Sequence, residues 1–154
     1  MSAVPDFHEI PDLERFLTYR FHLLGKLTDP ETTRAYLDEC DMSLGEARCL
    51  AAIGRFGPLS LNDLAQAANL DKGHASRSAQ RLATRGLISK SVSQSDGRGV
   101  VLALLPQGRE RYRDTIALIA RRNREVFGCL SQDEQDQLAD LLDRVIAAQR
   151  RQVE

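Results

Sequence analysis

Apolar residues recur at helical spacing near both ends of the chain, which predicts long amphipathic helices there. We expect one helix over residues 12–26, a break at Asp29-Pro30, and a second helical piece to about Glu39. Further helices are expected over residues 109–129 and after Ser131. The apolar face of the first helix consists of Leu13, Phe16, Leu17, Phe21 and Leu24, and that of the last of Leu138, Leu141, Leu142, Val145 and Ile146.

Serine-led capping motifs mark where the helices of the central region begin. Ser43 and Glu46 form a capping box that opens a helix to about Phe56, where Gly57-Pro58 stops it. Ser60 opens a short helix that breaks at Asn69-Leu70, and Asp71 restarts a longer basic helix that runs to about Arg85. A true capping box at residues 131–134 opens the last helix.

The only stretch with β character lies directly after the basic helix. Two β-rich runs, residues 88–94 and 100–105, flank the turn sequence Asp96-Gly97-Arg98-Gly99 and predict a hairpin. A helix, a turn, a second helix and a hairpin make a winged helix-turn-helix, a shape that fits duplex DNA. The expected fold class is therefore mainly α with a small β-hairpin wing, and with long helices on either side of this core.

Positive charge is concentrated in this central region although the whole chain has a net charge of −1. Residues 1–70 carry a net charge of −5, residues 71–98 carry +4, and residues 99–154 are neutral. A local positive field of this kind attracts phosphate. An ordinary solvated basic face is the alternative, and charge alone does not decide between the two.

The remaining chemistry of the chain excludes several function classes. Its three cysteines, Cys40, Cys49 and Cys129, have no metal-ligand spacing and fit reduced thiols. The first 12 residues lack the features of a signal peptide, and no stretch is apolar enough to span a membrane, so we expect a cytoplasmic protein. There is no catalytic triad spacing, no glycine-rich phosphate loop and no metal or cofactor motif, so we expect no enzyme.

The basic helix has one face that is suited to packing and one that is suited to recognition. Ala75, Ala79 and Leu82 share the packing face. Arginine bonds guanine and glutamine bonds adenine in a bidentate manner, while serine donates to phosphate or base. An exposed polar face without a ligand is the alternative. The candidate DNA-binding residues on this helix are Gly73, Ser76, Arg77, Gln80 and Thr84, with Lys72 and His74 on the flank of its first turn.

The predicted wing adds a second candidate contact. Arg98 at the hairpin tip is placed to enter a neighbouring minor groove, and Asp96 is placed to orient its guanidinium. A plain tight turn is the alternative for Asp96-Gly97, and both interpretations are compatible.

Residues 43–108 resemble the MarR family of bacterial transcriptional regulators. The resemblance depends on the helix-turn-helix, on Arg85-Gly86-Leu87-Ile88 after the basic helix, and on the wing pattern that reads Asp96-Gly97-Arg98 here. The long flanking helices match the family layout. Two positions depart from it: Gly97 replaces one of two adjacent wing arginines, and Leu105 replaces a threonine that would cap the following helix.

The resemblance implies a homodimer that binds a palindromic operator in double-stranded DNA. Residues 1–42 would then form N-terminal helices for dimerisation and one wall of a ligand pocket, residues 43–108 the DNA-binding lobe, and residues 109–154 the C-terminal dimerisation helices. The apolar face of the last helix supports dimerisation separately, although such a face could also form intramolecular core. Further apolar residues available for the interface are Ile116, Ile119, Val126 and Phe127.

Regulators of this family commonly respond to small aromatic anions, and Arg20 is our candidate for binding one. It lies within the apolar face of the first helix, where a guanidinium is costly unless it is paired. Its partner is either an Asp or Glu carboxylate of either chain or a ligand. With the ligand as partner, the resemblance implies a repressor that is released by a planar aromatic or N-heteroaromatic carboxylate. The other candidate ligand-binding residues are Tyr19, Phe21, His22 and Arg48.

Two other functions compete with this hypothesis. One is a thiol-based redox-sensing repressor of the same fold, for which Cys40 near a helix end is a better candidate than Cys49; neither has an adjacent His or Lys. The other is a helical interaction module that does not bind DNA.

Overall fold

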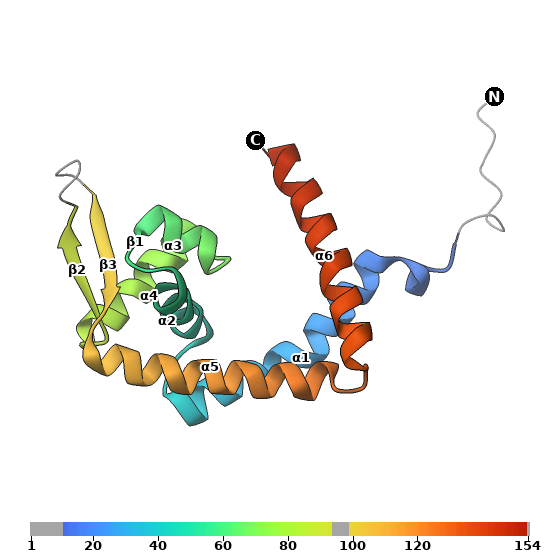
Figure 1. Cartoon of the computed structure of the whole chain (residues 1–154), viewed down its shortest axis with the longest axis horizontal. Helices are drawn as coiled ribbons and strands as arrows, with labels where there is room; N and C mark the ends of the chain where they lie inside the picture. The colour runs from blue at the N-terminus through green and yellow to red at the C-terminus, as the bar shows by residue number, and fades with distance from the viewer. Residues whose placement is uncertain (1–10, 94–98, 154) are drawn as a thin grey trace. The chain divides into compact units, whose positions relative to one another are not determined.

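The computed structural model describes residues 11–93 and 99–153 of the chain (Figure 1). It divides into two compact units, Met1–Thr115 and Ile116–Glu154. Within the described ranges, none of the helices combines the length and the hydropathy that a membrane span requires.

The first long helix of the structure is continuous, so the expected break at Asp29-Pro30 is wrong. A 3₁₀ turn, η2 (Leu13–Arg15), and the extended residue Phe16 precede helix α1 (Leu17–Cys40). Pro30 lies inside α1 although its ring removes one main-chain donor and crowds the preceding turn, so the helical residues on both sides of it outweigh this local cost. The side chains of Thr28 and Thr32 donate to the carbonyl groups of Leu24 and Thr28, at 2.9 and 3.0 Å, on either side of the proline.

The capping motifs of the central region begin helices where the sequence predicts them. In α2 (Leu44–Phe56), Ser43 Oγ accepts from the Glu46 N–H, and the Glu46 carboxylate accepts from the Ser43 N–H. Ser60 Oγ caps α3 (Leu61–Ala67) by accepting from the Asp63 N–H at 3.1 Å. Asp71 caps α4 (Lys72–Thr84), which is the basic helix.

The predicted hairpin is present and belongs to a three-stranded antiparallel sheet. Strands β2 (Ile88–Val92) and β3 (Val100–Leu104) pair with Ile88 opposite Leu104. The sequence did not predict β1 (Leu59–Ser60), which pairs with the other edge of β3 and gives the order β1-β3-β2. A strand of two residues has no periodicity to detect, so only its pairing partner reveals it.

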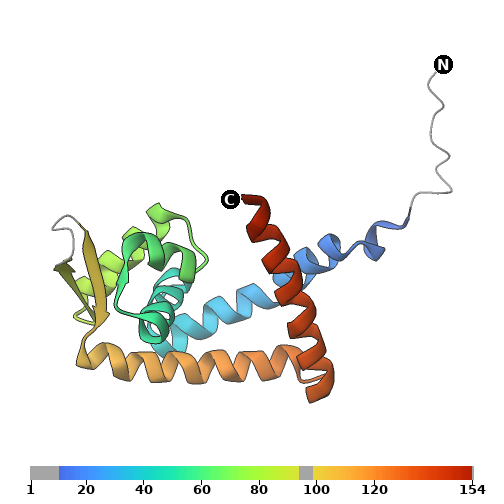
Figure 2. The ribbon, with the colours of Figure 1, turned by 45° about the horizontal axis from the view of Figure 1, so that its top comes forward.

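The core of the first unit lies between α2, α3, α4 and the sheet, which Figure 2 shows grouped together. Its largest fully buried side chains include Leu50, Leu64, Leu82 and Leu102. These contacts confirm a mainly α winged helix-turn-helix fold with a β-hairpin.

Helices α2 and α4 approach each other closely because glycine occupies position 45. A Cβ atom there would lie 2.5 Å from His74 Nε2 and 2.6 Å from Ser78 Oγ, so even alanine would force these side chains to move. A second close approach occurs at Gly108, whose backbone packs directly on the Leu87 carbonyl group.

Two long helices complete the chain. Helix α5 (Pro106–Phe127) begins three residues before the expected start, because Pro106 is well suited to the first helical position, where no N–H is needed. Helix α6 (Gln132–Val153) begins at the predicted capping box, in which Ser131 and Glu134 exchange hydrogen bonds of 2.8 and 3.2 Å.

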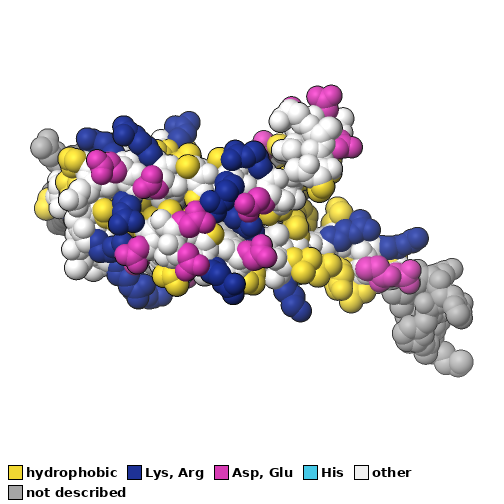
Figure 3. Space-filling model, turned by 90° about the horizontal axis from the view of Figure 1, so that it is seen from below, with side chains coloured by type: hydrophobic (Ala, Val, Ile, Leu, Met, Phe, Trp, Pro, Cys, Tyr) yellow, Lys and Arg dark blue, Asp and Glu magenta, His cyan; other side chains and the backbone are white. Residues whose placement is uncertain are grey.

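Two groups of large apolar side chains remain exposed on the single chain, one on η2 and α1 and the other on α6. Figure 3 shows those of η2 and the first half of α1 as a cluster of yellow side chains. On α6 the same is true of Leu141, Val145 and Ile146, which are 47–58% exposed. The exposed residues of the first group are Leu13, Phe16, Leu17, Phe21, Leu24 and Leu27.

Candidate nucleic-acid interface

Helix α4 begins at an ionised cap. The Asp71 carboxylate accepts a hydrogen bond of 2.8 Å from the His74 N–H, and this bond lowers the pKa of Asp71 below its usual value. The cap therefore keeps its charge at neutral pH, where it complements the positive end of the helix dipole.

The two faces of α4 divide as the sequence predicts. Ala75, Ala79 and Leu82 are each at most 1% exposed. The small side chains of the two alanines let the helix lie close to α2. The recognition face is open to solvent: Lys72, Gly73, Arg77, Gln80 and Thr84 are exposed and Ser76 is half-buried.

His74 differs from the other candidates because its ring packs against α2. The ring covers Gly45, and the residue as a whole is only half-exposed. His74 therefore contributes to the contact between α2 and α4, and its part in DNA binding stays a prediction.

Gln80 belongs to a chain of hydrogen bonds that links α4 to the wing. Lys90 Nζ on β2 donates to Gln80 Oε1 at 2.7 Å, and Gln80 Nε2 donates to Thr84 Oγ1 at 3.4 Å. Sequence reasoning did not select Lys90 as a site residue, although it counted among the charges of residues 71–98. Its contact with Gln80 depends on the packing of β2 beside α4, which periodicity does not show.

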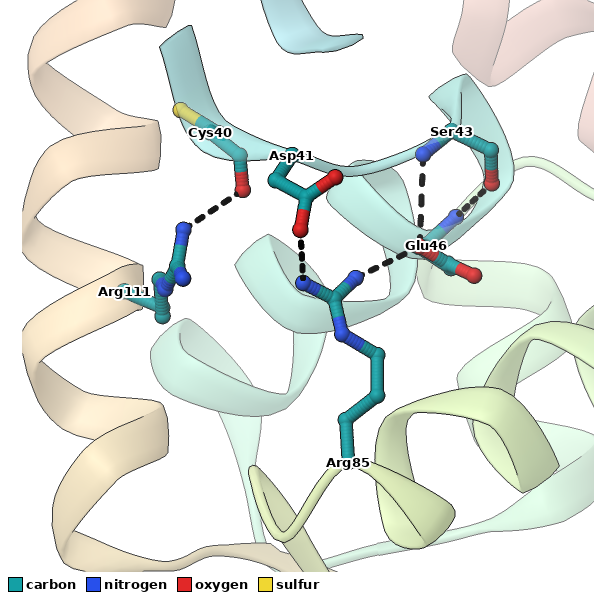
Figure 4. A network of polar contacts seen from close by, with 6 residues as sticks. All are labelled: Cys40, Asp41, Ser43, Glu46, Arg85 and Arg111. Atoms are coloured by element: carbon teal, nitrogen blue, oxygen red, sulfur yellow. Dashed lines mark hydrogen bonds and ion pairs between the residues drawn. The ribbon is translucent and has the colours of Figure 1, made fainter.

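The end of α4 is fixed to the start of α2 by Arg85, another residue that sequence reasoning did not select (Figure 4). One nitrogen of its guanidinium lies 3.1 Å from Glu46 Oε2 and the other 3.3 Å from Asp41 Oδ2. The Glu46 side chain is only 9% exposed, whereas that of Asp41 is 82% exposed. The bond to Glu46 is therefore shielded from water and the bond to Asp41 is not.

A second arginine holds the end of α1. Arg111 on α5 donates to the Cys40 main-chain oxygen at 2.7 Å, and Asp41 ends the helix with a positive φ of 51° (Figure 4). An aspartate tolerates this left-handed conformation better than most residues. Asp41 thus turns the chain sharply between α1 and α2.

Two of the three cysteines are buried and their thiols are held protonated. Desolvation by burial raises the pKa of Cys49 to about 11, and burial also raises the pKa of Cys40. The hydroxyl of Ser78, which is itself fully buried, lowers the pKa of Cys49 but does not offset the larger effect of burial. Cys129 is exposed.

The candidate ligand-binding residues lie on the surface of the single chain. Tyr19, Arg20, Phe21 and His22 are exposed on α1, and Arg20 Nε donates to the Glu14 main-chain oxygen at 3.1 Å. Arg48 is exposed on α2, where its charge lowers the pKa of Tyr36 against the larger, opposing effect of burial.

A cavity of about 270 Å³ occurs in the second unit, between α5 and α6. Phe127, Leu138 and Leu142 line it, together with polar side chains, and none of the candidate ligand-binding residues does. Arg98 and Asp96 lie outside the described residues. Within the described residues, no three potential metal ligands lie together.

Fold and site together define a winged helix-turn-helix protein with a polar, arginine-bearing recognition helix. Known proteins that are similar to this chain belong to the same class. Residues 41–99 match the model of the MarR family. The HTH-type transcriptional regulator BilQ of Clostridium symbiosum is 28% identical over 112 residues, which are 73% of this chain and 78% of that protein.

Solved structures extend the likeness to the long helices. PcaV from Streptomyces coelicolor, solved with its natural ligand, is 25% identical, with a TM-score of 0.73 over 96% of this chain and 99% of that chain. BpsR from Bordetella bronchiseptica, whose DNA binding is regulated by 6-hydroxynicotinic acid, is 20% identical, with a TM-score of 0.79 over 88% and 96%. Residues 41–99 of the chain thus resemble the MarR family, and the relatives BilQ and PcaV are transcriptional regulators rather than enzymes.

We expect the two ion pairs of Arg85 to differ in their contribution to stability. Arg85→Met leaves the shielded Glu46 carboxylate without its cation and should lower the free energy of unfolding by about 1–3 kcal/mol. Asp41→Asn should change it by less than about 0.5 kcal/mol, because the exposed bond is weakened by water. Urea-induced unfolding measures the free energy of unfolding of both variants. Equal losses in the two variants would contradict the stronger role given to the bond between Arg85 and Glu46.

We expect the buried thiols to be unreactive in the folded protein. At pH 7 the raised pKa values leave little thiolate on Cys40 or Cys49, and the thiolate is the reactive form. In Cys129→Ala protein, iodoacetamide should label neither cysteine before unfolding and both after it, as mass spectrometry would show. Rapid labelling of the native variant at Cys40 would restore the redox hypothesis.

Proposed function

We propose that the chain is a homodimeric repressor that binds a palindromic operator and is released by a small aromatic carboxylate. The observation that carries this proposal is the exposed polar face of α4, whose opposite face is fixed in the core of a lobe that resembles the MarR family. Arg77 is exposed on that face, where its guanidinium would make a bidentate contact with guanine. The local charge of +4 over residues 71–98 favours approach to the phosphate backbone.

Dimerisation is supported by the apolar surface that a single chain leaves uncovered. Leu17 and Leu27 on α1 are 67% and 65% exposed, and Val145 on α6 is 58% exposed. Exposed apolar surfaces of this extent mark protein–protein contacts. A second copy of the chain would cover both, so we assign residues 1–42 and 109–154 to the dimer and residues 43–108 to DNA binding.

For the effector we propose a planar aromatic or N-heteroaromatic carboxylate. Arg20 offers a guanidinium among exposed apolar side chains of α1, a setting that suits an aromatic ring with an anionic group. Tyr19 and His22 are neighbours that could bond ring substituents. BpsR, which shares the fold, responds to 6-hydroxynicotinic acid, a molecule of this class.

Release from DNA would follow from a change in the spacing of the two recognition helices. Successive major grooves are about 34 Å apart on B-DNA, so a ligand that favours another spacing favours the free dimer. A regulator of this kind works in the cytoplasm, where the chromosome is. The redox alternative receives no support from the buried, protonated Cys40 and Cys49.

We expect operator binding to depend on Arg77 and Arg98. In gel shifts with the chain's own promoter DNA, the double variant Arg77→Ala/Arg98→Ala should bind at least about tenfold more weakly, since each bidentate or groove contact is worth about 1–3 kcal/mol. Arg151→Ala, which removes an exposed charge at the end of α6, is the matched control. Unchanged binding by the double variant, or a strictly monomeric chain at micromolar concentration, would refute the arrangement.

We expect the effector site to depend on Arg20. Calorimetric titration with 6-hydroxynicotinate and salicylate should show binding to the wild type and at least about tenfold weaker binding to Arg20→Ala, because the carboxylate loses its charged partner. Arg55→Ala, an exposed arginine at the end of α2, serves as the control for loss of a positive charge. Equal affinity of wild type and Arg20→Ala would remove Arg20 from the site.

A further inference from the structure

We propose that Lys90 is a specificity-determining residue: it fixes the Gln80 carboxamide so that the two side chains together present hydrogen-bond donors to the major groove and select guanine rather than adenine. The inference rests on the proposed DNA-binding function and adds a base preference to it.

The first argument comes from the lysine itself. An ammonium group only donates hydrogen bonds, and Lys90 Nζ lies 2.7 Å from the Gln80 side chain. The carboxamide atom that faces β2 must therefore be the oxygen. Because the donor is charged, this is the stronger of the two bonds that the carboxamide makes.

The second argument comes from Thr84 and gives the same orientation. The threonine hydroxyl has one hydrogen, which it donates to the Gln80 main-chain oxygen at 2.9 Å. Toward the Gln80 side chain it can therefore only accept, so the atom 3.4 Å away must be the nitrogen. Two chemically different neighbours thus fix which end of the carboxamide is which.

The structure also explains why Lys90 is in position. Alternation along β2 places Ile88 and Lys90 on the same face of the strand, and Ile88 is buried in the core while Lys90 is exposed. Lys90 pairs with Leu102 of β3, which is also buried. Buried Ile88 and Leu102 thus hold the strand next to the lysine, and β2 lies beside α4 (Figure 1), where Lys90 Nζ contacts the Gln80 side chain.

The Lys90–Gln80 pair can offer mainly hydrogen-bond donors to a DNA base. The ammonium keeps two N–H groups and Gln80 Nε2 keeps one, whereas the carboxamide oxygen already accepts from the ammonium. Guanine presents two acceptors in the major groove, O6 and N7, which match such a pair of donors. Adenine presents N7 and an amino group, and that amino group would have to approach an oxygen beside another donor.

This conclusion changes the expectation drawn from the sequence. A glutamine on a recognition helix, considered alone, predicts bidentate binding of adenine through a free oxygen and a free nitrogen. Lys90 already donates to the oxygen, so an adenine amino group would have to share that oxygen with the ammonium, and the glutamine contributes mainly as a donor. The wing thereby affects which nucleotide base α4 selects, through the side chain of Lys90 on β2.

The test is selection of duplexes from a randomised pool by the full-length protein, followed by sequencing, for the wild type and three variants. The wild type should select guanine at one position of each half-site, and Gln80→Ala should lose the preference at that position. Lys90→Met should shift the preference there from guanine to adenine, with about a tenfold change in relative affinity. Lys90→Arg, which retains a donor-only side chain, should keep guanine.

Other outcomes would contradict either the role of Lys90 in base selection or the proposed DNA-binding function. If Lys90→Met weakens binding to all sequences alike and leaves the base preference unchanged, Lys90 is a phosphate contact only. Selection of adenine by the wild type, at the DNA position where Gln80→Ala loses the preference, would also contradict the inference. Lys26→Met, which removes an exposed lysine from α1, controls for loss of charge. A wild type that selects no sequence at all would refute the proposed DNA-binding function itself.

Discussion

The close packing of α4 on α2 is the contact on which the rest of the DNA-binding lobe depends. Gly45 on α2 and Ala75 and Ala79 on α4 have almost no side chain, so the two helices approach until the His74 ring covers the glycine. Interiors are packed as densely as crystals, so a contact of this kind has one arrangement and little freedom. The orientation of the polar face of α4 follows from it, because the buried side fixes the exposed side.

Arg85 fixes the position of α4 along α2, which the packing of small side chains alone does not. Small side chains fix the distance between helices but resist sliding poorly, whereas a guanidinium between Glu46 and Asp41 fixes where the end of α4 lies along α2. Arg111 fixes the end of α1 to α5 in a comparable way. Two arginines thus hold the segment between α1 and α2, which joins the proposed dimerisation helix to the DNA-binding lobe.

Local signals in the sequence predicted most of the elements, because those signals act over three or four residues. The capping boxes at Ser43 and Ser131 and the start of α4 at Asp71 are examples, as is the buried side of α4. Pro30 shows the limit: the cost of a proline is local, but whether a helix absorbs it depends on the residues around it. Strand β1 and the roles of Lys90 and Arg85 depend on contacts between residues 10 to 44 positions apart, which no local pattern shows.

Glu46 has two tasks that draw on the same carboxylate: it accepts from the Ser43 N–H at the start of α2 and from the guanidinium of Arg85. A shorter aspartate could not satisfy both, and an apolar residue would leave a half-buried cation without its main partner. Positions 46 and 85 are therefore not free to drift independently during evolution. Among homologues of this chain, loss of the acid at the first position should accompany loss of the base at the second.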